Sequence, residues 1–177
     1  MEIKNKKNGF ALIVAVIFMS VMLSFGLALS SLGYKQAVLA SSALESQYAF
    51  YAADGGLECA LYADQQQNLF AYTSNMSATA PVMNCDGIAP YSASVQSHTA
   101  SSWTILERLS IDAGTSRPHC ADITIIKPNP SPTSTSTTYI YSQGYDVSCD
   151  TVASPGLGRY VTRALGIRYS SSVGALP

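Results

Sequence analysis

Between residues 10 and 34 the chain reads FALIVAVIFMSVMLSFGLALSSLGY, without a single Asp, Glu, Lys or Arg. Most of these residues are Ala, Leu, Ile, Val, Met or Phe. A helix of roughly 20 apolar residues spans the hydrocarbon core of a bilayer, so this segment is long enough to do so. A core helix of a soluble domain rarely extends this far without a charge. The segment therefore predicts one membrane-inserted helix.

The only dense basic cluster, Lys4, Lys6 and Lys7, comes immediately before the apolar segment. Positive residues beside a membrane segment stay in the cytoplasm, so we expect the long remainder of the chain to lie outside it. The formal net charge of the whole chain is −1. Because this charge offers no basic surface for phosphate groups, we predict no nucleic-acid partner.

All four cysteines follow the apolar segment. An even number of cysteines in an extracytoplasmic domain predicts disulfides. Proximity along the sequence favours the pairs Cys59 with Cys85 and Cys120 with Cys149. The chain has only two histidines and no CxxC pair, so we expect no zinc site, and no other cofactor is indicated.

Helical periodicity continues beyond the apolar segment. Apolar and aromatic residues recur at spacings of three and four residues, typical of one face of an amphipathic helix. This predicted face consists of Ala37, Ala40, Leu44, Tyr48, Tyr51, Cys59 and Tyr62. Gly55 and Gly56 indicate a bend or a close packing contact. We predict one helix from about Phe10 to about Tyr62, with its second half covering a globular domain.

A conventional secretory signal is an alternative interpretation of the same N-terminus. Such a signal has a basic start, a short apolar segment and a cleavage site with small residues. Residues Ala28-Leu29-Ser30 would suit that site. The apolar segment is long for a signal, however, and the helical pattern continues through the proposed cut. A freely secreted domain therefore stays the second interpretation.

The C-terminal half has the alternation and the turn residues of an antiparallel β-domain. Residues 68–101 are polar and rich in turn formers, and we expect mostly loop there. Residues 103–109 form a strand or a short helical turn, and residues 121–127 form a strand. Residues 137–149 alternate with three tyrosines and Val147 on one face, and residues 160–169 alternate again, with Arg163 on the apolar face.

These elements predict an α+β fold in which a long N-terminal helix packs on a small antiparallel sheet, because such a sheet needs one apolar face covered. We divide the chain into a leader (1–9), a membrane or filament-core helix (10–34), an amphipathic helix (35–66) and a globular β-domain with disulfides (67–177).

Two segments of the sequence resemble the type IV pilin-like superfamily. Lys6-Lys7-Asn8-Gly9 followed by Phe10-Ala11-Leu12-Ile13-Val14 looks like the leader that a prepilin peptidase cleaves and N-methylates. Residues 47–58, QYAFYAADGGLE, are similar to the AF-x-AA-[ED]-x-G-[LI]-E segment of PilX-type minor pilins. The resemblance covers about the first 62 residues, and the rest of the chain carries no motif that matches the superfamily.

The resemblance implies cleavage between Gly9 and Phe10, with N-methylation of Phe10. It also implies that the chain resides in the cytoplasmic membrane before assembly and then in an extracellular filament. Its partners would be other pilin subunits, the prepilin peptidase and the inner-membrane assembly platform. Most major pilins have Glu as the fifth mature residue, where this chain has Val14. This difference favours a minor pilin or pseudopilin that acts in initiation or at the tip.

Two groups of residues invite a chemical role, and each has a simpler interpretation. Cys120 lies beside Arg117 and His119, a setting that lowers the pKa of a thiol, but an oxidising compartment favours a structural disulfide. Asp54, Glu58 and Asp64 have near-helical spacing, which is also typical of a solvated helix face. We therefore predict no catalytic or metal site and no enzymatic activity. The alternative to a filament subunit is a secreted or membrane-anchored extracellular binding domain.

Overall fold

A computed structural model of the chain describes residues 8–85, 87, 89–130, 136–156 and 159–171. The described chain divides into two compact units, residues 1–43 and 44–177. The long helix α1 (Asn8–Gln65) contributes to both units. The predicted helix is therefore confirmed. Its predicted leader falls on residues 1–9, of which residues 1–7 lie outside the described part.

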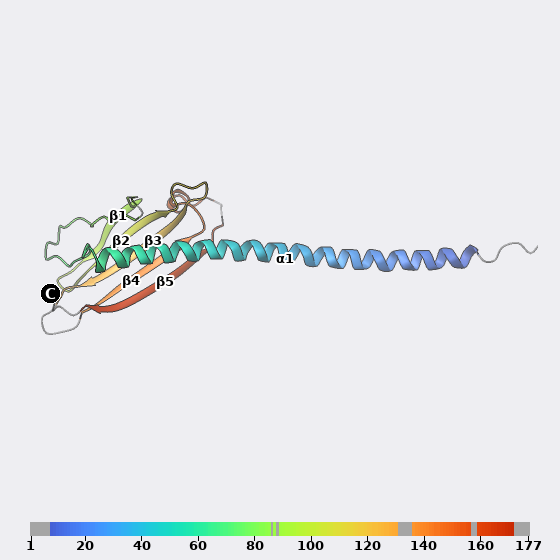
Figure 1. The fold of residues 1–177 in the computed structure, drawn as a ribbon, viewed down its shortest axis with the longest axis horizontal. Helices are drawn as coiled ribbons and strands as arrows, with labels where there is room; N and C mark the ends of the chain where they lie inside the picture. The colour runs from blue at the N-terminus through green and yellow to red at the C-terminus, as the bar shows by residue number, and fades with distance from the viewer. Residues whose placement is uncertain (1–7, 86, 88, 131–135, 157–158, 172–177) are drawn as a thin grey trace, which may run out of the picture. The chain divides into compact units, whose positions relative to one another are not determined.

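The globular unit contains one five-stranded antiparallel sheet whose strands follow one another in chain order (Figure 1). The strands are β1 (Ser92–His98), β2 (Ser102–Ile111), β3 (His119–Pro128), β4 (Ser136–Tyr145) and β5 (Thr162–Ser171). A short helix, α2 (Cys149–Ala153), lies between β4 and β5 in the sequence. The predicted α+β fold with an antiparallel meander is therefore confirmed.

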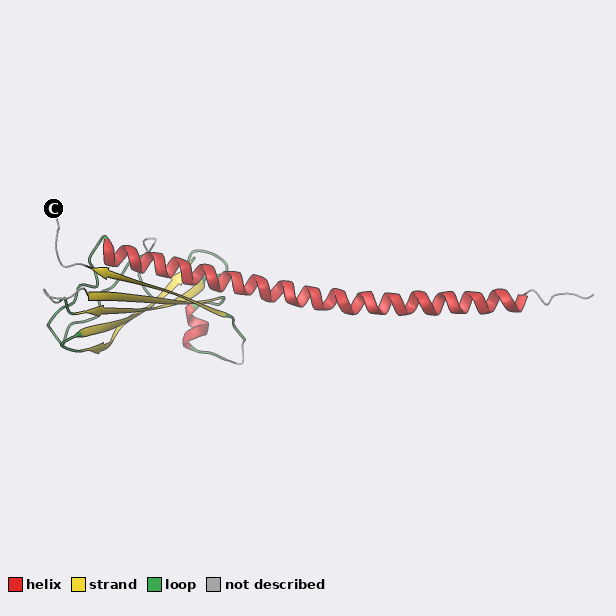
Figure 2. Cartoon of the chain, turned by 90° about the horizontal axis from the view of Figure 1, so that it is seen from below, coloured by secondary structure: helices red, strands yellow, loops and turns green. Residues whose placement is uncertain are grey.

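The two faces of the sheet have different covers (Figure 2). The C-terminal part of α1 packs on one face, and α2 lies against one end of the opposite face, where Cys149 is bonded to Cys120 of β3. The helix-covered face holds the core. Its largest fully buried side chains are Phe70, Met83, Ile105, Leu109, Ile123, Ile125 and Ile140. We call the opposite face of the sheet the open face.

The face of α1 that packs on the sheet is not the face predicted from the sequence. Apart from Asp64, its buried residues are small: Ala49, Ala52, Ala53, Gly56, Ala60 and Ala63. The larger members of the predicted face are instead exposed, with Leu44 at 50%, Tyr51 at 65% and Tyr62 at 59%. The physical reason is close approach. A Cβ at Gly144 of β4 would overlap the backbone of Ala49 and Ala53, so only small residues fit between this helix and the sheet.

The C-terminus of α1 is closed by a left-handed residue. Asn68 has φ of 50°, and the amide of Leu69 donates to the carbonyl of Ala63 at 3.0 Å. Asn tolerates the left-handed region well, and this bond satisfies one of the last carbonyls of the helix, which have no partner within it. The turn directs the next residue, Phe70, into the core, where it is fully buried.

Three details of the β-domain differ from the sequence predictions, and one predicted alternative is decided. Strand β1 falls in a segment predicted as loop, because its Ser-rich edge position buries only part of Ala93 and Val95. Strand β4 ends at Tyr145, not Cys149, which begins α2. Of the two alternatives predicted for residues 103–109, a strand or a short helical turn, the strand is confirmed. The tyrosines of β4 lie on the open face, because Thr138, Ile140 and Ser142 are the buried, helix-facing residues.

Candidate functional site

The N-terminal half of α1 is the most apolar surface of the described chain. All of its large apolar side chains are exposed, from Phe10 at 74% to Leu39 at 67%. By length and composition, this helix is long enough and apolar enough to cross a membrane. Two hydroxyls inside it are satisfied locally, because Ser20 donates to the carbonyl of Ile17 and Ser24 to that of Val21, each at 2.8 Å. Such bonding suits an apolar environment.

The residues of the predicted processing site lie at the start of this helix. Gly9 and Phe10 belong to α1, which begins at Asn8. Val14, the residue at the position of the pilin glutamate, is 49% exposed. Lys4, Lys6 and Lys7 of the predicted leader lie outside the described residues. Cleavage before Phe10 and its methylation therefore stay predictions.

Both disulfides are present with the predicted pairing. Cys59 of α1 is bonded to Cys85 in the segment before β1, with a Cα–Cα distance of 6.0 Å. Cys120 of β3 is bonded to Cys149 of α2, at 4.8 Å. Among the described residues no cysteine is free. Each bond ties a segment of little regular structure to the helix or the sheet, which limits the conformational freedom of the unfolded chain.

The disulfide also removes the thiol that Cys120 would need as a nucleophile. The neighbouring basic residues pack on an aromatic ring instead. The His119 ring stacks on Tyr48 with centroids 5.0 Å apart, and the Arg117 guanidinium lies 5.6 Å from the centre of the same ring. The expectation of a structural disulfide at this place is confirmed.

The three carboxylates at near-helical spacing do not form one cluster. Asp64 turns toward the sheet and is only 4% exposed, whereas Glu58 is exposed. Asp64 accepts two bonds from the Lys127 ammonium, at 2.7 and 2.6 Å, and one from the Tyr169 hydroxyl. Burial and the bond to Asp64 raise the pKa of Tyr169. Within the described part of the chain, no three His, Cys, Asp or Glu side chains are grouped as metal ligands.

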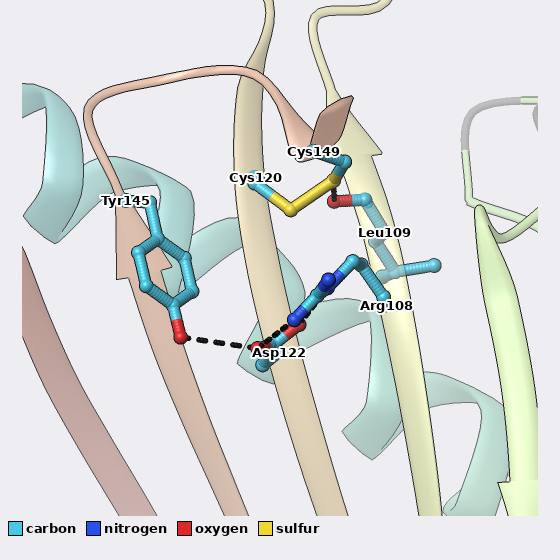
Figure 3. A network of polar contacts seen from close by, with 6 residues as sticks. All are labelled: Arg108, Leu109, Cys120, Asp122, Tyr145 and Cys149. Carbon is cyan, nitrogen blue, oxygen red and sulfur yellow. Dashed lines mark hydrogen bonds and ion pairs between the residues drawn. A yellow bond between two sulfur atoms is a disulfide. The ribbon is translucent and has the colours of Figure 1, made fainter. Parts of the chain in front are cut away.

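A second polar network lies on the open face beside α2 (Figure 3). Arg108 of β2 donates from Nε and Nη2 to the two oxygens of Asp122 of β3, at 2.5 and 2.7 Å, and the Tyr145 hydroxyl donates to the same carboxylate at 3.0 Å. The Asp122 carboxylate raises the pKa of Arg108. Burial, with Asp122 as a further cause, raises the pKa of Tyr145 to about 12. These hydrogen bonds tie β2, β3 and β4 together, a structural role.

Glu107 of β2 is a carboxylic acid inside the core, with 2% of its surface exposed. One oxygen accepts the Met83 amide at 3.3 Å, and the other has no hydrogen-bond partner among the described residues. Burial raises the pKa of Glu107 to about 7, and the bond from Met83 opposes this shift. Glu107 was not among the predicted functional residues, although a charged residue between the apolar Ile105 and Leu109 on the buried face of a strand is a recognisable signal.

A groove runs along α1 on the globular unit, and we call it the tyrosine groove. It consists of two hollows that share Ile111 and Asp112 at the end of β2. One hollow, of about 500 Å³, lies against Glu58 and Tyr62, and the other, of about 390 Å³, lies against Tyr48 and Tyr51. The helical periodicity of the sequence predicts these tyrosines on the buried face of the helix. The groove exists because alanines occupy that face instead.

The architecture is pilin-like: a long N-terminal apolar helix that continues into a helix packed on a five-stranded antiparallel sheet. The apolar helix and the two disulfides are typical of a membrane-anchored or extracellular protein. Comparison with known proteins finds no family model, no curated protein and no solved structure that matches the chain.

Proposed function

We propose that this chain is a subunit of an extracellular filament of the type IV pilus class, which includes related secretion and DNA-uptake filaments. The supporting observation is the contrast along α1. Its first half exposes every large apolar side chain, and its second half packs on the sheet through small ones. A surface of this length needs a bilayer or other apolar helices around it. A filament subunit uses both in turn, the membrane before assembly and neighbouring helices after it.

Within this class we propose a minor pilin or pseudopilin that acts in initiation or at the tip. The supporting residue is Val14, the fifth residue after the Gly9–Phe10 junction. A charged amine in an apolar filament core is costly unless a carboxylate pairs with it. A valine offers no carboxylate to the amine of a neighbour. A subunit without this group suits a position where no neighbour requires it.

The test is the amount of the chain in filaments sheared from the cells that make them. We expect the chain to be present, at a small fraction of the major subunit. In the Val14→Glu variant the carboxylate would lie in an apolar setting without a partner amine. We therefore expect no gain in the proportion of the chain within the filaments, and reduced retention in the membrane.

The matched control is Val16→Glu, which places the same charge two residues away on the same exposed helix. Equal behaviour of the two variants fits a subunit with no partner amine. A selective gain for Val14→Glu would show an interior position in the shaft. Absence of the wild-type chain from sheared filaments would overturn the filament proposal, and a wild-type chain that forms most of the filament mass would overturn the minor role.

A further inference from the structure

The tyrosine groove combines exposed aromatic surface with a depression beside a rigid helix. Tyr51 and Tyr62 are 65% and 59% exposed, although both side chains are large enough to bury well. Tyrosine is enriched at protein interfaces, because its ring provides apolar contact at a small cost in conformational entropy. Gly55 lies between them, and a Cβ built there would meet nothing within 4 Å. This part of the helix is therefore open to a partner.

The larger hollow of the groove is acidic, and no histidine, lysine or arginine lines it among the described residues. Glu58 and Asp112 both border the larger hollow. The globular unit as a whole, residues 44–177, has six Lys and Arg against ten Asp and Glu, so its formal charge is 6 − 10 = −4. An occupant with positive charge would therefore be attracted to the groove, and the phosphates of a nucleic acid would be repelled.

One contact within the chain already shows how a cation packs against a groove residue. The Arg117 guanidinium lies 5.6 Å from the centre of the Tyr48 ring, within the range of a cation–π interaction. Tyr51 and Tyr62 offer the same kind of ring further along the groove, with more of their surface exposed. A second arginine or lysine, from outside the chain, would find both an aromatic ring and a carboxylate there.

The opposite flank of α1 has the complementary chemistry. Arg163 of β5 donates to Ser46 of α1 at 2.9 Å, which places β5 on the flank away from the groove. Arg159 precedes this edge strand and Arg168 lies within it, and all three arginines are exposed. A neighbouring subunit that carries a similar basic strand edge would complement the acidic groove, in the head-to-tail manner of contacts that build open filaments.

We propose that the tyrosine groove is the docking surface for a neighbouring filament subunit, which inserts a strand edge that carries arginine or lysine. This inference rests on the proposed filament function and names the surface and the chemistry of one contact. The apolar part of α1 supplies adhesion that depends little on sequence. The groove supplies selectivity, because a neighbour with an acidic edge would meet like charges.

The experiment places a photo-crosslinking benzoylphenylalanine at Tyr51, and separately at Tyr62, in the full chain within cells that make the filament. We expect an adduct with a pilin-like subunit, mapped by peptide mass spectrometry to a segment that contains arginine or lysine. Glu58→Lys should lower the yield about tenfold or more, because reversal puts like charges together. Asp54→Lys, on the same helix outside the groove lining, should leave the yield nearly unchanged.

The same crosslinker at Val21, in the apolar half of α1, separates the two proposals. A subunit adduct from Val21 without one from Tyr51 or Tyr62 would overturn the groove inference and leave the filament function standing. An adduct mapped to a segment without basic residues, or a yield that Glu58→Lys does not change, would also overturn the inference. Loss of the Val21 adduct as well would overturn the filament proposal and, with it, the docking of a filament subunit in the groove.

Discussion

The two halves of α1 are one continuous helix with opposite relations to their surroundings. From residue 10 to residue 43 its large apolar side chains are exposed, and from residue 44 onward its small residues are buried on the sheet. The second half finds its packing partner within the chain. The first half has no such partner among the described residues of its own unit. The second half of α1 therefore packs within its own chain, whereas the first half needs a membrane or other apolar helices around it.

Magnitudes strengthen this comparison. Full burial of one Val, Leu, Ile, Phe or Met side chain stabilises by about 1.5–3 kcal/mol. More than a dozen such side chains are exposed between Phe10 and Leu39. The free energy available to a membrane or to packed helices is therefore large compared with the stability of a typical domain, about 5–15 kcal/mol. The second half buries mostly alanines. Its packing on the sheet therefore depends on how closely the backbones of helix and sheet approach, and less on the apolar area that is buried.

The largest expected effect comes from adding a methyl group where β4 and α1 lie closest together. In Gly144→Ala the new methyl group would overlap the backbone of Ala49 and Ala53, which cannot move as a side chain can. We expect a loss of about 3 kcal/mol or more in the free energy of unfolding of the globular unit. Thermal unfolding of the full chain in detergent, followed by near-UV circular dichroism, measures it. Gly114→Ala, with open space around it, is the control, and equal stability of the two variants would contradict the packing.

The disulfides should stabilise only the globular unit. Replacing Cys120 and Cys149 together by alanine should cost about 2–4 kcal/mol of that unit's stability. Membrane insertion of the first half should not change, as carbonate extraction would show, because both cysteines lie beyond it. Peptide mapping without reduction should recover the bonds Cys59–Cys85 and Cys120–Cys149. Four free thiols in the protein from cells would refute the extracytoplasmic assignment.

Glu107 should make the stability of the globular unit depend on pH. Its pKa is raised to about 7 from an ordinary value of 4.5, so the folded state favours the protonated acid. This contribution is fully present below about pH 4.5 and is lost as the pH rises through 7, on the order of 1–3 kcal/mol by pH 8. Glu107→Gln should flatten the unfolding profile between pH 5 and 8. A wild type that is equally stable at both ends would contradict the assignment, and Glu58→Gln, at an exposed position, should keep the wild-type slope.

The smallest expected effect concerns two glycines of α1, Gly56 and Gly26. A Cβ at Gly56 would lie 2.9 Å from Ser142 Oγ and 3.0 Å from Ala121 Cβ, whereas a Cβ at Gly26 would meet nothing within 4 Å. Gly56→Ala should cost about 1 kcal/mol in the free energy of unfolding of the globular unit. Gly26→Ala should increase helicity, since alanine is favoured over glycine by about 0.5–1 kcal/mol. Helicity by far-UV circular dichroism and unfolding by near-UV circular dichroism separate the two, and a stabilised Gly56→Ala would refute the close contact.

The sequence predicted the parts of this fold that a local pattern determines. The apolar segment, the length of α1, the alternation of β5 and the nearest-neighbour disulfides all followed from residues close together in the chain. The orientation of α1 on the sheet did not, because it depends on Gly144 of β4 and not on the helix alone. The periodicity of large apolar side chains predicted the wrong face, because the buried residues of the helix are mostly alanines.

The polar contacts of the globular unit could not be predicted from local sequence patterns, for a related reason. Lys127 is 63 residues from the Asp64 that it pairs with, and Arg108 is 14 residues from Asp122. Their pairing depends on the strand register and on the position of α1. The tyrosine groove was missed because it is a consequence of the helix orientation. Glu107, by contrast, had a local signal, a charged residue in the apolar row of a strand.

The central claim, a filament subunit that keeps its apolar helix, is tested most directly by the N-terminus of the protein recovered from cells. Intact-mass and N-terminal peptide mass spectrometry should find a chain that starts at Phe10 with a methylated amine. Loss of residues 1–9 removes three lysines and one glutamate, so the formal charge of the mature chain would be 7 − 10 = −3. A mature chain that starts at Ser31, after Ala28-Leu29-Ser30, would contradict the account, because the apolar helix would then be a discarded secretory signal.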